Sequence, residues 1–453
     1  MQEDKHKQLH VDFELNNEKI WKMMDKIRGS NESIKHQIVG LLTYKYLSEN
    51  IKNNSEDIGY KLDENLYYEN LLINRGNVID ILKKGINQIT NQNENIQAAD
   101  VFYDLFDFID FENFNDNNVW LLFIENVEKL CSQTNATIGD IIISVTKYDS
   151  SKRGRAGGLK PTEEMIKLIT TDQKDVKNIY DPYTDEATLL AEIGKTITVE
   201  NYYGQHPDRE KCVLAKMTLL ANNVNYKNIS IKCNDIPELI NWNVKFDLCV
   251  SIPPINLKKF KIYKDERFRS FTPRRSEFAY LLDMLYNLDD EGTIKMIVAD
   301  GILFSSRDKN IIKYLVDNKL ISSIIGLPGG LLDSTSIATA LLTINKKPTD
   351  EGIYYLNIRN AETTRLRRKL IRIEDIDKYV KLLSNKEEQE LISKIATIEE
   401  IHENDYNLSI NRYVDFEILE AIDIEKTISN IKEIKKELKQ VDEELNEKME
   451  GLF

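Results

Sequence analysis

The sequence predicts an α/β fold with a mostly parallel sheet, and three observations lead to this prediction. Between residues 159 and 347, short apolar runs alternate with helical patterns, which is typical of parallel strands covered by helices on both faces. Residues 1–150 carry apolar side chains at helical spacing. After residue 415, apolar residues recur in steps of three and four, as in one long amphipathic helix.

Length and composition limit the class of protein. With 453 residues the chain is too long for one core, and we expect two or three domains. An apolar content of 41% and a charged content of 30% fit a soluble globular protein. Because no apolar run approaches the ~20 residues that cross a bilayer and the first residues are polar, we expect a cytoplasmic protein without a membrane partner. The four cysteines and five histidines are scattered, so neither a disulfide framework nor a metal site is indicated.

The order of the patterns divides the chain into four regions. They are a helical N-terminal domain (1–150), a sheet domain (151–347), an extension of that domain (348–415) and a C-terminal docking helix (416–453). A basic, glycine-containing stretch at 150–158 marks the first boundary. In the helical domain, the acidic and aromatic segment 98–114 is expected to pack its phenylalanine rings in the core.

The strands of the sheet domain follow from the apolar runs. We expect them at Lys177–Asp181, Thr196–Asn201, Ile229–Cys233, Phe246–Ser251, Ile294–Ala299, Ile321–Leu327 and Ala338–Asn345. The helices between them include Asp208–Ala221, Ser276–Leu288 and Lys309–Asn318. The short loop between the last two strands suits an antiparallel pair at the edge of the sheet. A further strand is expected at Tyr354–Ile358.

One strand, Phe246–Ser251, ends abruptly at Pro253-Pro254. A double proline lacks ladder donors and cannot continue a central strand. In an open α/β sheet, a break at the carboxyl end of a strand is where ligands bind. We therefore expect the site of this chain at the Pro-Pro turn.

A local basic cluster follows that turn, although the net charge of the chain is −14. Its members are Lys258, Lys259, Lys261, Lys264, Arg267, Arg269, Arg274 and Arg275. Phenylalanine and tyrosine residues are interleaved with them, which suits phosphate contact combined with base stacking. The cluster is predicted to contact DNA; the alternative is a solvated loop whose rings pack on the domain.

The last region carries an apolar seam. The seam residues include Ile424, Ile428, Ile431, Leu438, Val441 and Leu445, with Lys and Glu on the flanks. A helix of this kind is stabilised mainly by burying its apolar stripe. The seam packs either on the body of its own chain or on a partner subunit, and the sequence leaves both possibilities open.

Several segments carry a resemblance to a known family. The Pro-Pro turn resembles the Asn-Pro-Pro-aromatic motif of DNA adenine methyltransferases, and further segments are similar to the modification (M) subunit of type I restriction–modification systems. These segments are Trp21–Gly29, Leu41–Tyr46, Ser276–Leu285, Leu320–Leu331 and Asn404–Val414. The resemblance implies a class I (Rossmann-like) methyltransferase domain with a mostly parallel seven-stranded sheet. It also implies double-stranded DNA, a DNA-specificity subunit, a second M-like subunit and a restriction subunit as partners.

The resemblance identifies the positions that bind S-adenosylmethionine in the family. In this chain they are Asp181, Asp185, Ala187, Thr188, His206 and Asp235. Asp185, Ala187 and Thr188 replace the three glycines of the family's turn, and their side chains would narrow the pocket. His206 replaces the acid that holds the ribose, and a histidine cannot accept hydrogen bonds from two hydroxyls as a carboxylate does. We therefore expect no cofactor.

The catalytic motif has changed as well. Pro253 and Pro254 are present, but Ile252 stands in place of the asparagine and Ile255 in place of the aromatic residue. In the family, a polar side chain and a backbone carbonyl polarise the amine of a flipped adenine, and the ring stacks on the base. Ile252 offers no acceptor and Ile255 no ring, so no catalytic residue is intact.

Three hypotheses follow from this sequence. The favoured one is a catalytically inactive M-like subunit that acts in complex assembly and in embracing DNA, within a restriction or related DNA-defence system. The second is an active adenine methyltransferase with unusual motifs that binds S-adenosylmethionine. The third is an interaction protein that captures family partners outside restriction.

Overall fold

The computed structural model describes most of the chain between residues 31 and 414. The described ranges are 31–53, 58–91, 96–132, 136–152, 161–234, 240–255, 266–268, 271–332, 337–348, 352–365, 371–414, 435–436 and 438. The helices are α2 (Asn31–Asn53), α3 (Glu69–Ile73), α4 (Val78–Thr90), α5 (Ile96–Phe102), α6 (Asn117–Ser132), α7 (Ile138–Lys152), α8 (Glu163–Thr170), α9 (Thr188–Thr196), α10 (Arg209–Ala221), α11 (Ser276–Asn287), α12 (Lys309–Asp317), α13 (Ile376–Asn385) and α14 (Ile398–Glu403). The strands are β1 (Asp175–Asp181), β2 (Thr198–Gln205), β3 (Ile229–Lys232), β4 (Phe246–Ser251), β5 (Leu288–Ala299), β6 (Ile321–Leu327), β7 (Thr339–Asn345), β8 (Ile353–Asn357), β9 (Thr363–Arg365), β10 (Ile371–Ile373) and β11 (Ser393–Ala396).

A nine-stranded mixed sheet forms the centre of the fold, in the order β11-β8-β6-β7-β5-β4-β1-β2-β3. From β3 to β5 neighbouring strands are parallel, whereas β7 is antiparallel to both β5 and β6. The expected α/β class and the antiparallel pairing of β6 with β7 are confirmed. The expected strand number is wrong, and the pair is not at the edge, because β8 and β11 from region 348–415 extend the sheet beyond β6.

The sheet separates two apolar cores because successive side chains of a strand point to opposite faces. In β4, Leu248 and Val250 belong to one core and Cys249 to the other. In β8, Tyr354 and Tyr355 divide in the same way. Apolar residues of α8, α9 and α10 fill the first core and those of α11 and α12 the second. Burial on both faces explains why β4 and β6 appear in the sequence as continuous apolar runs.

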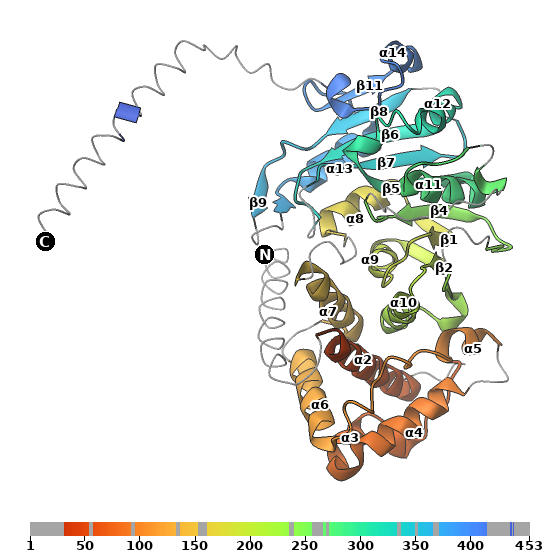
Figure 1. Ribbon diagram of the computed structural model, residues 1–453, viewed down its shortest axis with the longest axis vertical. Helices are drawn as coiled ribbons and strands as arrows, with labels where there is room; N and C mark the ends of the chain where they lie inside the picture. Colours follow the sequence, from red (N-terminus) through yellow and green to blue (C-terminus); the bar gives the residue numbers. More distant parts are fainter. Residues whose placement is uncertain are drawn as a thin grey trace, which may run out of the picture.

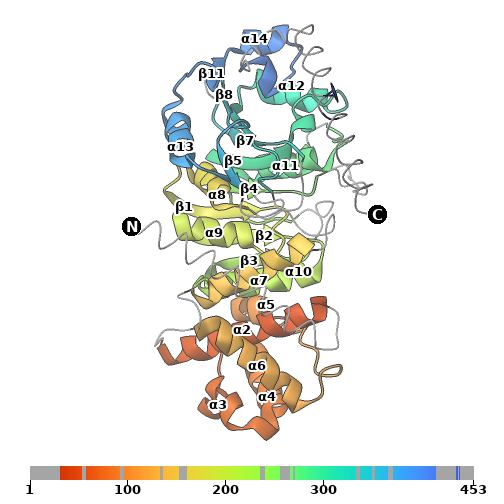
Figure 2. The same ribbon diagram turned by 90° about the vertical axis from the view of Figure 1, so that its left-hand side faces the viewer.

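The N-terminal helices lie at one end of an elongated molecule, next to β3, while α14 lies at the opposite end (Figures 1 and 2). Helices α2 and α7 pack against α10 of the sheet domain, and one apolar core runs through both parts. Phe102 and Phe106 of the acidic, aromatic segment are buried in that core, as the sequence predicts. The helical region therefore packs on the sheet domain through one continuous apolar core.

Ion pairs line this boundary as well. Asp104 and Asp100 pair with Lys216 and Lys232 at 2.7 and 3.2 Å, and Asp140 pairs with Lys195 at 2.6 Å. Arg209 pairs with Asp107. The acids of the helical region thus meet cations of the sheet domain, so much of the negative charge of segment 98–114 is balanced locally.

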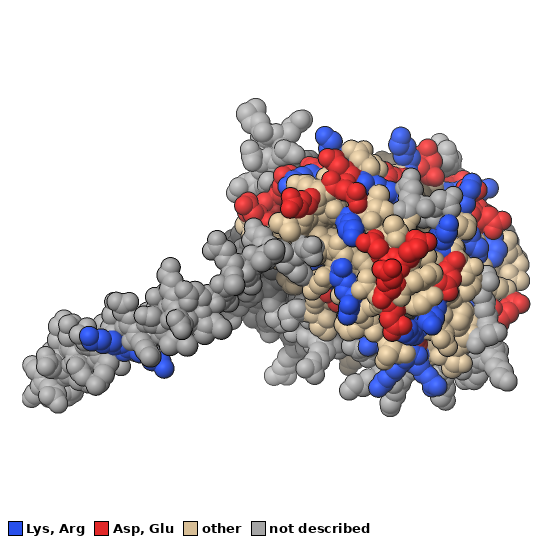
Figure 3. Space-filling view, turned by 90° about the horizontal axis from the view of Figure 1, so that it is seen from above, with Lys and Arg blue, Asp and Glu red and all other residues tan. Residues whose placement is uncertain are grey.

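At the opposite end of the molecule, the described residues carry charges of both signs. Figure 3 views that end, and its lysine and arginine side chains are interspersed with aspartate and glutamate. A duplex-binding surface requires clustered positive charge, so this end is a poor candidate for one. None of the helices in the described part of the chain is long and apolar enough to cross a membrane.

Candidate functional site

The site begins where two parallel neighbours, β1 and β4, end. Asp181 is the last residue of β1 and Ser251 the last of β4, and the Ser251 hydroxyl donates to Asp181 Oδ1 at 2.9 Å. The backbone N–H of Tyr183 donates to the same oxygen at 2.9 Å. Asp181 is only 2% exposed, and this burial raises its pKa to about 7. The carboxyl group therefore fixes the two strand ends to one another.

The turn after β1 follows a left-handed path. Asp185 has a φ of 46° and Ala187 a φ of 56°, at two of the positions where the resemblance places glycine. The N–H of Thr184 donates to Gln205 O at 3.0 Å, and the N–H of Ala187 donates to Thr184 O at 2.7 Å. Thr188, the third replaced glycine, is the first residue of α9 and has no positive φ. The glycines have been replaced while positive φ is kept at Asp185 and Ala187.

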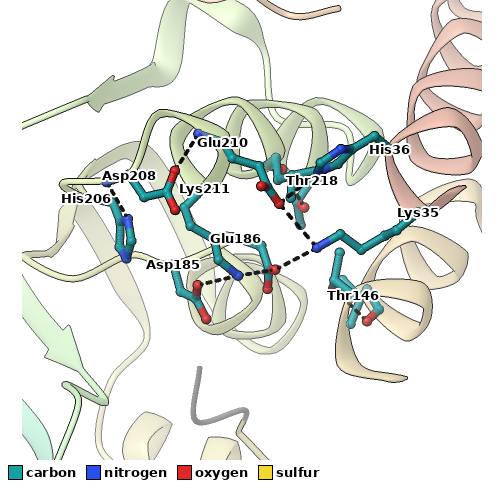
Figure 4. Close-up of polar contacts among 12 residues, drawn as sticks. Lys35, His36, Thr146, Asp185, Glu186, His206, Asp208, Glu210, Lys211 and Thr218 are labelled. Carbon is teal, nitrogen blue, oxygen red and sulfur yellow. Dashed lines mark hydrogen bonds and ion pairs between the residues drawn. The ribbon is translucent and has the colours of Figure 1, made fainter. Parts of the chain in front are cut away.

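The acids of this turn are neutralised by lysines (Figure 4). Lys211 Nζ of α10 lies 3.0 Å from Asp185 Oδ1 and 2.5 Å from Glu186 Oε1. Lys35 Nζ of α2 lies 3.7 Å from the same Glu186 oxygen. Glu186 is 2% exposed, so its charge depends on these partners.

His206 follows β2 directly and is buried. Its Nδ1 accepts a hydrogen bond from the N–H of Asp208 at 3.0 Å, and its ring packs edge-on against Tyr183, with centroids 4.4 Å apart. Burial lowers the pKa of His206, so the imidazole is neutral. Tyr183 also packs against Tyr280. Aromatic packing therefore surrounds the residue that replaces the ribose-binding acid.

The cavity at this edge of the sheet is small. Its lining includes Asp181, Tyr183, Thr188 and Ile252, and its volume is about 20 Å³. That volume holds about one water, whereas ligand pockets measure roughly 300–1,000 Å³. Buried polar atoms without a hydrogen-bond partner among the described residues lie in and around this edge; they are Thr184 Oγ1, Thr188 Oγ1, Gln205 Nε2 and His206 Nε2. As described, the residues do not fit a nucleoside-sized cofactor.

The Pro-Pro turn follows β4 as the sequence predicts. Ile252 and Pro253 are buried, whereas Pro254 and Ile255 are half-buried. Ile252 lines the cavity with an aliphatic side chain. At the position where the resemblance implies a hydrogen-bond acceptor, the cavity lining has an aliphatic side chain.

The basic loop differs from the expectation at Arg267. This side chain is buried and its Nη1 lies 2.7 Å from Asp283 of α11, whose other oxygen accepts from the Tyr180 hydroxyl at 2.8 Å. Phe268 is buried too, and Phe271 packs against Tyr314. Arg267 is thus a structural anchor and does not contact DNA, because its guanidinium is enclosed and paired.

Two other arginines of the loop remain accessible. Arg274 is exposed and Arg275 is half-buried, next to Gly301 at the carboxyl end of β5. The other predicted DNA-contacting residues, Lys258, Lys259, Lys261, Lys264 and Arg269, lie outside the described residues, as do Asp235 and the seam residues Ile424, Ile428, Ile431, Val441 and Leu445. Leu438 is described and is 60% exposed.

The sequence reasoning missed three residues of the site: Lys35, Glu186 and Lys211. A usable signal was present, since two consecutive acids in a turn between a buried strand and a buried helix require cations nearby. Their partners could not be identified, because Lys35 is distant in sequence and belongs to another region.

Residues 140–421 match the family model described as N-6 DNA Methylase. The chain belongs to this N-6 DNA methylase family. The type I restriction enzyme MpnII methylase subunit of Mycoplasma pneumoniae is 26% identical, covering 92% of each chain. The MjaVII methylase subunit of Methanocaldococcus jannaschii is also 26% identical, covering 87% of this chain and 74% of that protein. The resemblance to type I M subunits is confirmed.

Solved structures share the fold of this N-6 DNA methylase family member. The type I restriction–modification methyltransferase subunit from Streptococcus thermophilus has a TM-score of 0.74 at 21% identity, covering 89% of this chain and all of that one. A chain from a structure addressing complex assembly and conformational transition of the type I restriction–modification system has a TM-score of 0.65 at 16% identity, covering 96% and 98%. The class I methyltransferase fold expected from the resemblance is confirmed.

Asp181 gives this edge of the sheet a testable pH dependence. Its pKa in the folded state is about 7, above the unfolded value of about 3.9, so the folded state holds the proton more tightly. The stability that this group contributes is present below about pH 4 and is lost as the pH rises to about 7. Asp181→Asn removes this titration and keeps an acceptor for Ser251. As the pH rises from about 4 to about 7, titration of Asp181 should lower the parent's free energy of unfolding by up to about 4 kcal/mol. The variant lacks this titration and should not show this loss.

Urea unfolding of both proteins across this pH range measures the difference. Ser251→Ala, which leaves the carboxyl group in place but removes a hydrogen bond that lowers its pKa, is the control and should still lose stability as the pH rises, with the loss extending to higher pH than in the parent. Parallel curves for the parent and Asp181→Asn would contradict the assignment.

Proposed function

We propose that this chain is an M-type subunit of a type I restriction–modification or related DNA-defence complex, and that it does not itself transfer methyl groups. Its role is to hold a DNA-specificity subunit, with a second M-like subunit and a restriction subunit as further partners, and to embrace double-stranded DNA in the cytoplasm. The similarity to type I methylase subunits along nearly the whole chain supports the subunit role. The altered carboxyl edge of the sheet supports the absence of chemistry.

The observation that carries this proposal is the aliphatic side chain of Ile252 in the lining of the cavity. Methyl transfer to an amine requires an acceptor that directs the nitrogen lone pair toward the methyl group. Ile252 provides none, and the volume of about 20 Å³ of the cavity that the described residues line is further support. Removing one electrostatic contact of this kind lowers kcat by roughly 10²–10³. Losing the acceptor and the cofactor pocket together abolishes turnover.

One observation favours the second candidate, an active adenine methyltransferase that binds S-adenosylmethionine. The turn after β1 has positive φ at Asp185 and Ala187, as a glycine turn would have. Backbone N–H groups are therefore presented along a similar path. Against this candidate, the side chain of Asp185 lines the cavity, where a glycine would have none.

Cofactor titration tests the absence of chemistry. S-adenosylmethionine should not raise the melting temperature of the chain, because the folded state does not bind this cofactor. A site with a Kd of about 10 μM would stabilise the chain by about 2.7 kcal/mol at about 1 mM cofactor. Transfer of a labelled methyl group to DNA, measured with and without a specificity subunit, should stay at background.

A type I M subunit that methylates adenine serves as the positive control for both measurements. Ile252→Asn combined with Ile255→Tyr should not restore transfer, since the cofactor pocket remains closed. Saturable cofactor binding, or label in the DNA, refutes the proposed inactivity.

The C-terminal seam gives a second prediction, on assembly. Leu438 is 60% exposed, so the part of the chain that the structure describes leaves this seam position uncovered. Each Leu or Ile buried at a subunit interface contributes roughly 1.5–3 kcal/mol. Ile431→Asp combined with Leu438→Asp should therefore abolish co-purification with the specificity subunit while the melting temperature stays near that of the parent.

The matched control changes Lys435 and Lys436, both exposed, to alanine. This variant should co-purify normally. Retention of the partner by the seam variant contradicts the docking role of this helix.

DNA contact by Arg274 and Arg275 gives a third prediction. Both lie at the carboxyl edge of the sheet, and each phosphate contact contributes about 0.9 to the slope of log affinity against log salt. In the assembled complex, changing both arginines to alanine should weaken duplex binding at low salt and lower this slope by about 1–2. Affinity measured over a range of salt concentrations gives the slope.

Lys347→Ala is the control, because Lys347 is an exposed cation near the amino end of β5, at the opposite edge. It should leave the slope unchanged. Equal slopes for the parent and the double arginine variant contradict the proposed contact.

A further inference from the structure

The buried carboxylate of Glu186 joins parts of the chain that are distant in sequence. Glu186 lies in the turn between β1 and α9, and only 2% of it is exposed. Its Oε1 is shared by Lys211 of α10 at 2.5 Å and by Lys35 of α2 at 3.7 Å. A charge so far from water is stable only when it is paired. The turn thus places a buried carboxylate between a cation of the sheet domain and a cation of the helical region.

The pairs continue on both sides of Glu186 (Figure 4). Lys211 also pairs with Asp185 at 3.0 Å, and Lys35 approaches Glu210 at 3.5 Å. His36 Nε2 lies 2.8 Å from the same Glu210 oxygen. Burial opposes ionisation of Glu210, but the hydrogen bond from His36 and the nearby lysines lower its pKa to about 2. Negative and positive side chains therefore alternate along this series of ion pairs, which links the turn, α10 and α2.

We infer that these residues form an interdomain clamp, consisting of Asp185, Lys211, Glu186, Lys35 and Glu210. The clamp fixes the helical region on the sheet domain without any ligand. The shared apolar core alone does not do this, because apolar burial is non-directional. Alternating buried charges, by contrast, are satisfied in one relative placement of α2, α10 and the turn. The turn that occupies the family's cofactor position thus acts as a joint between the two parts of the chain.

The clamp can be tested on the full-length chain, without cofactor or partner, so its failure is distinguishable from failure of the proposed function. Lys35→Met leaves Glu186 short of one cation, and Glu186→Gln leaves Lys35 without this carboxylate. Hydrogen exchange is followed in peptides from α2. Each single variant should raise the opening equilibrium of α2 roughly a hundredfold, the loss expected on removing one partner of a buried ion pair.

The double variant, Lys35→Met with Glu186→Gln, measures the coupling. Because it removes both the Lys35 and the Glu186 charge, neither is left unpaired, and Lys211 still forms its ion pair with Asp185. Its effect should be clearly smaller than the product of the two single effects. If a single variant does not fold, the double variant decides, since it should fold and show exchange closer to that of the parent.

Lys195→Met is the matched control. It removes an ion pair across the same boundary, with Asp140, but both side chains are about one-third exposed. Exposed pairs contribute little, so exchange of α2 should stay within about fivefold of the parent. The inference is overturned if Lys35→Met behaves like Lys195→Met, if the single effects simply multiply, or if the double variant fails to fold.

Discussion

Glu186 lies too far from water to keep its charge without a cation beside it, and the cations that it uses come from α10 and α2. The pairing links the carboxyl edge of the sheet to the helical region. Around it, Lys216 and Lys232 pair with acids of segment 98–114. The need to pair the Glu186 carboxylate therefore constrains three features together: the position of the helical region, the path of the turn after β1 and the orientation of α10. The apolar core provides most of the burial, and the charges specify the placement.

The sequence predicted those parts of the fold that depend on local burial. Strands β4 and β6 were placed to the residue, because both faces are covered and each strand is followed directly by a residue that breaks the pattern, the Ile252-Pro253 turn or Pro328. Strand β5 begins at Leu288, earlier than expected, because the polar residues that follow Leu288 give no apolar run there. The membership of β8 and β11 in the sheet could not be predicted, since it depends on the pairing of β8 with β6 and of β11 with β8, which leaves no local pattern.

The candidate site was predicted in position but not in its contacts. Asp181 and the Pro-Pro turn lie at the carboxyl edge, as the break in the strand indicates. Arg267 was misassigned, because a basic residue in a loop looks the same in sequence whether it faces solvent or pairs with Asp283 in the interior. Lys35 was missed for a related reason. The sequence does not show that a lysine is buried in an ion pair, because the partner carboxylate comes from a distant segment and is brought close only by the fold.

The turn after β1 shows how residues other than glycine can hold a left-handed path. Ala187 in the left-handed region costs about 1–2 kcal/mol relative to glycine, and Asp185 somewhat less, because a short polar side chain tolerates this region better. Such a conformation persists only where the surroundings determine it. Here the N–H groups of Thr184 and Ala187 are bonded, and Lys211 holds the carboxylate of Asp185. In a glycine turn the absence of side chains permits this path; in this chain hydrogen bonds and ion pairs impose it. The path is therefore a property of the fold and needs no bound cofactor to maintain it.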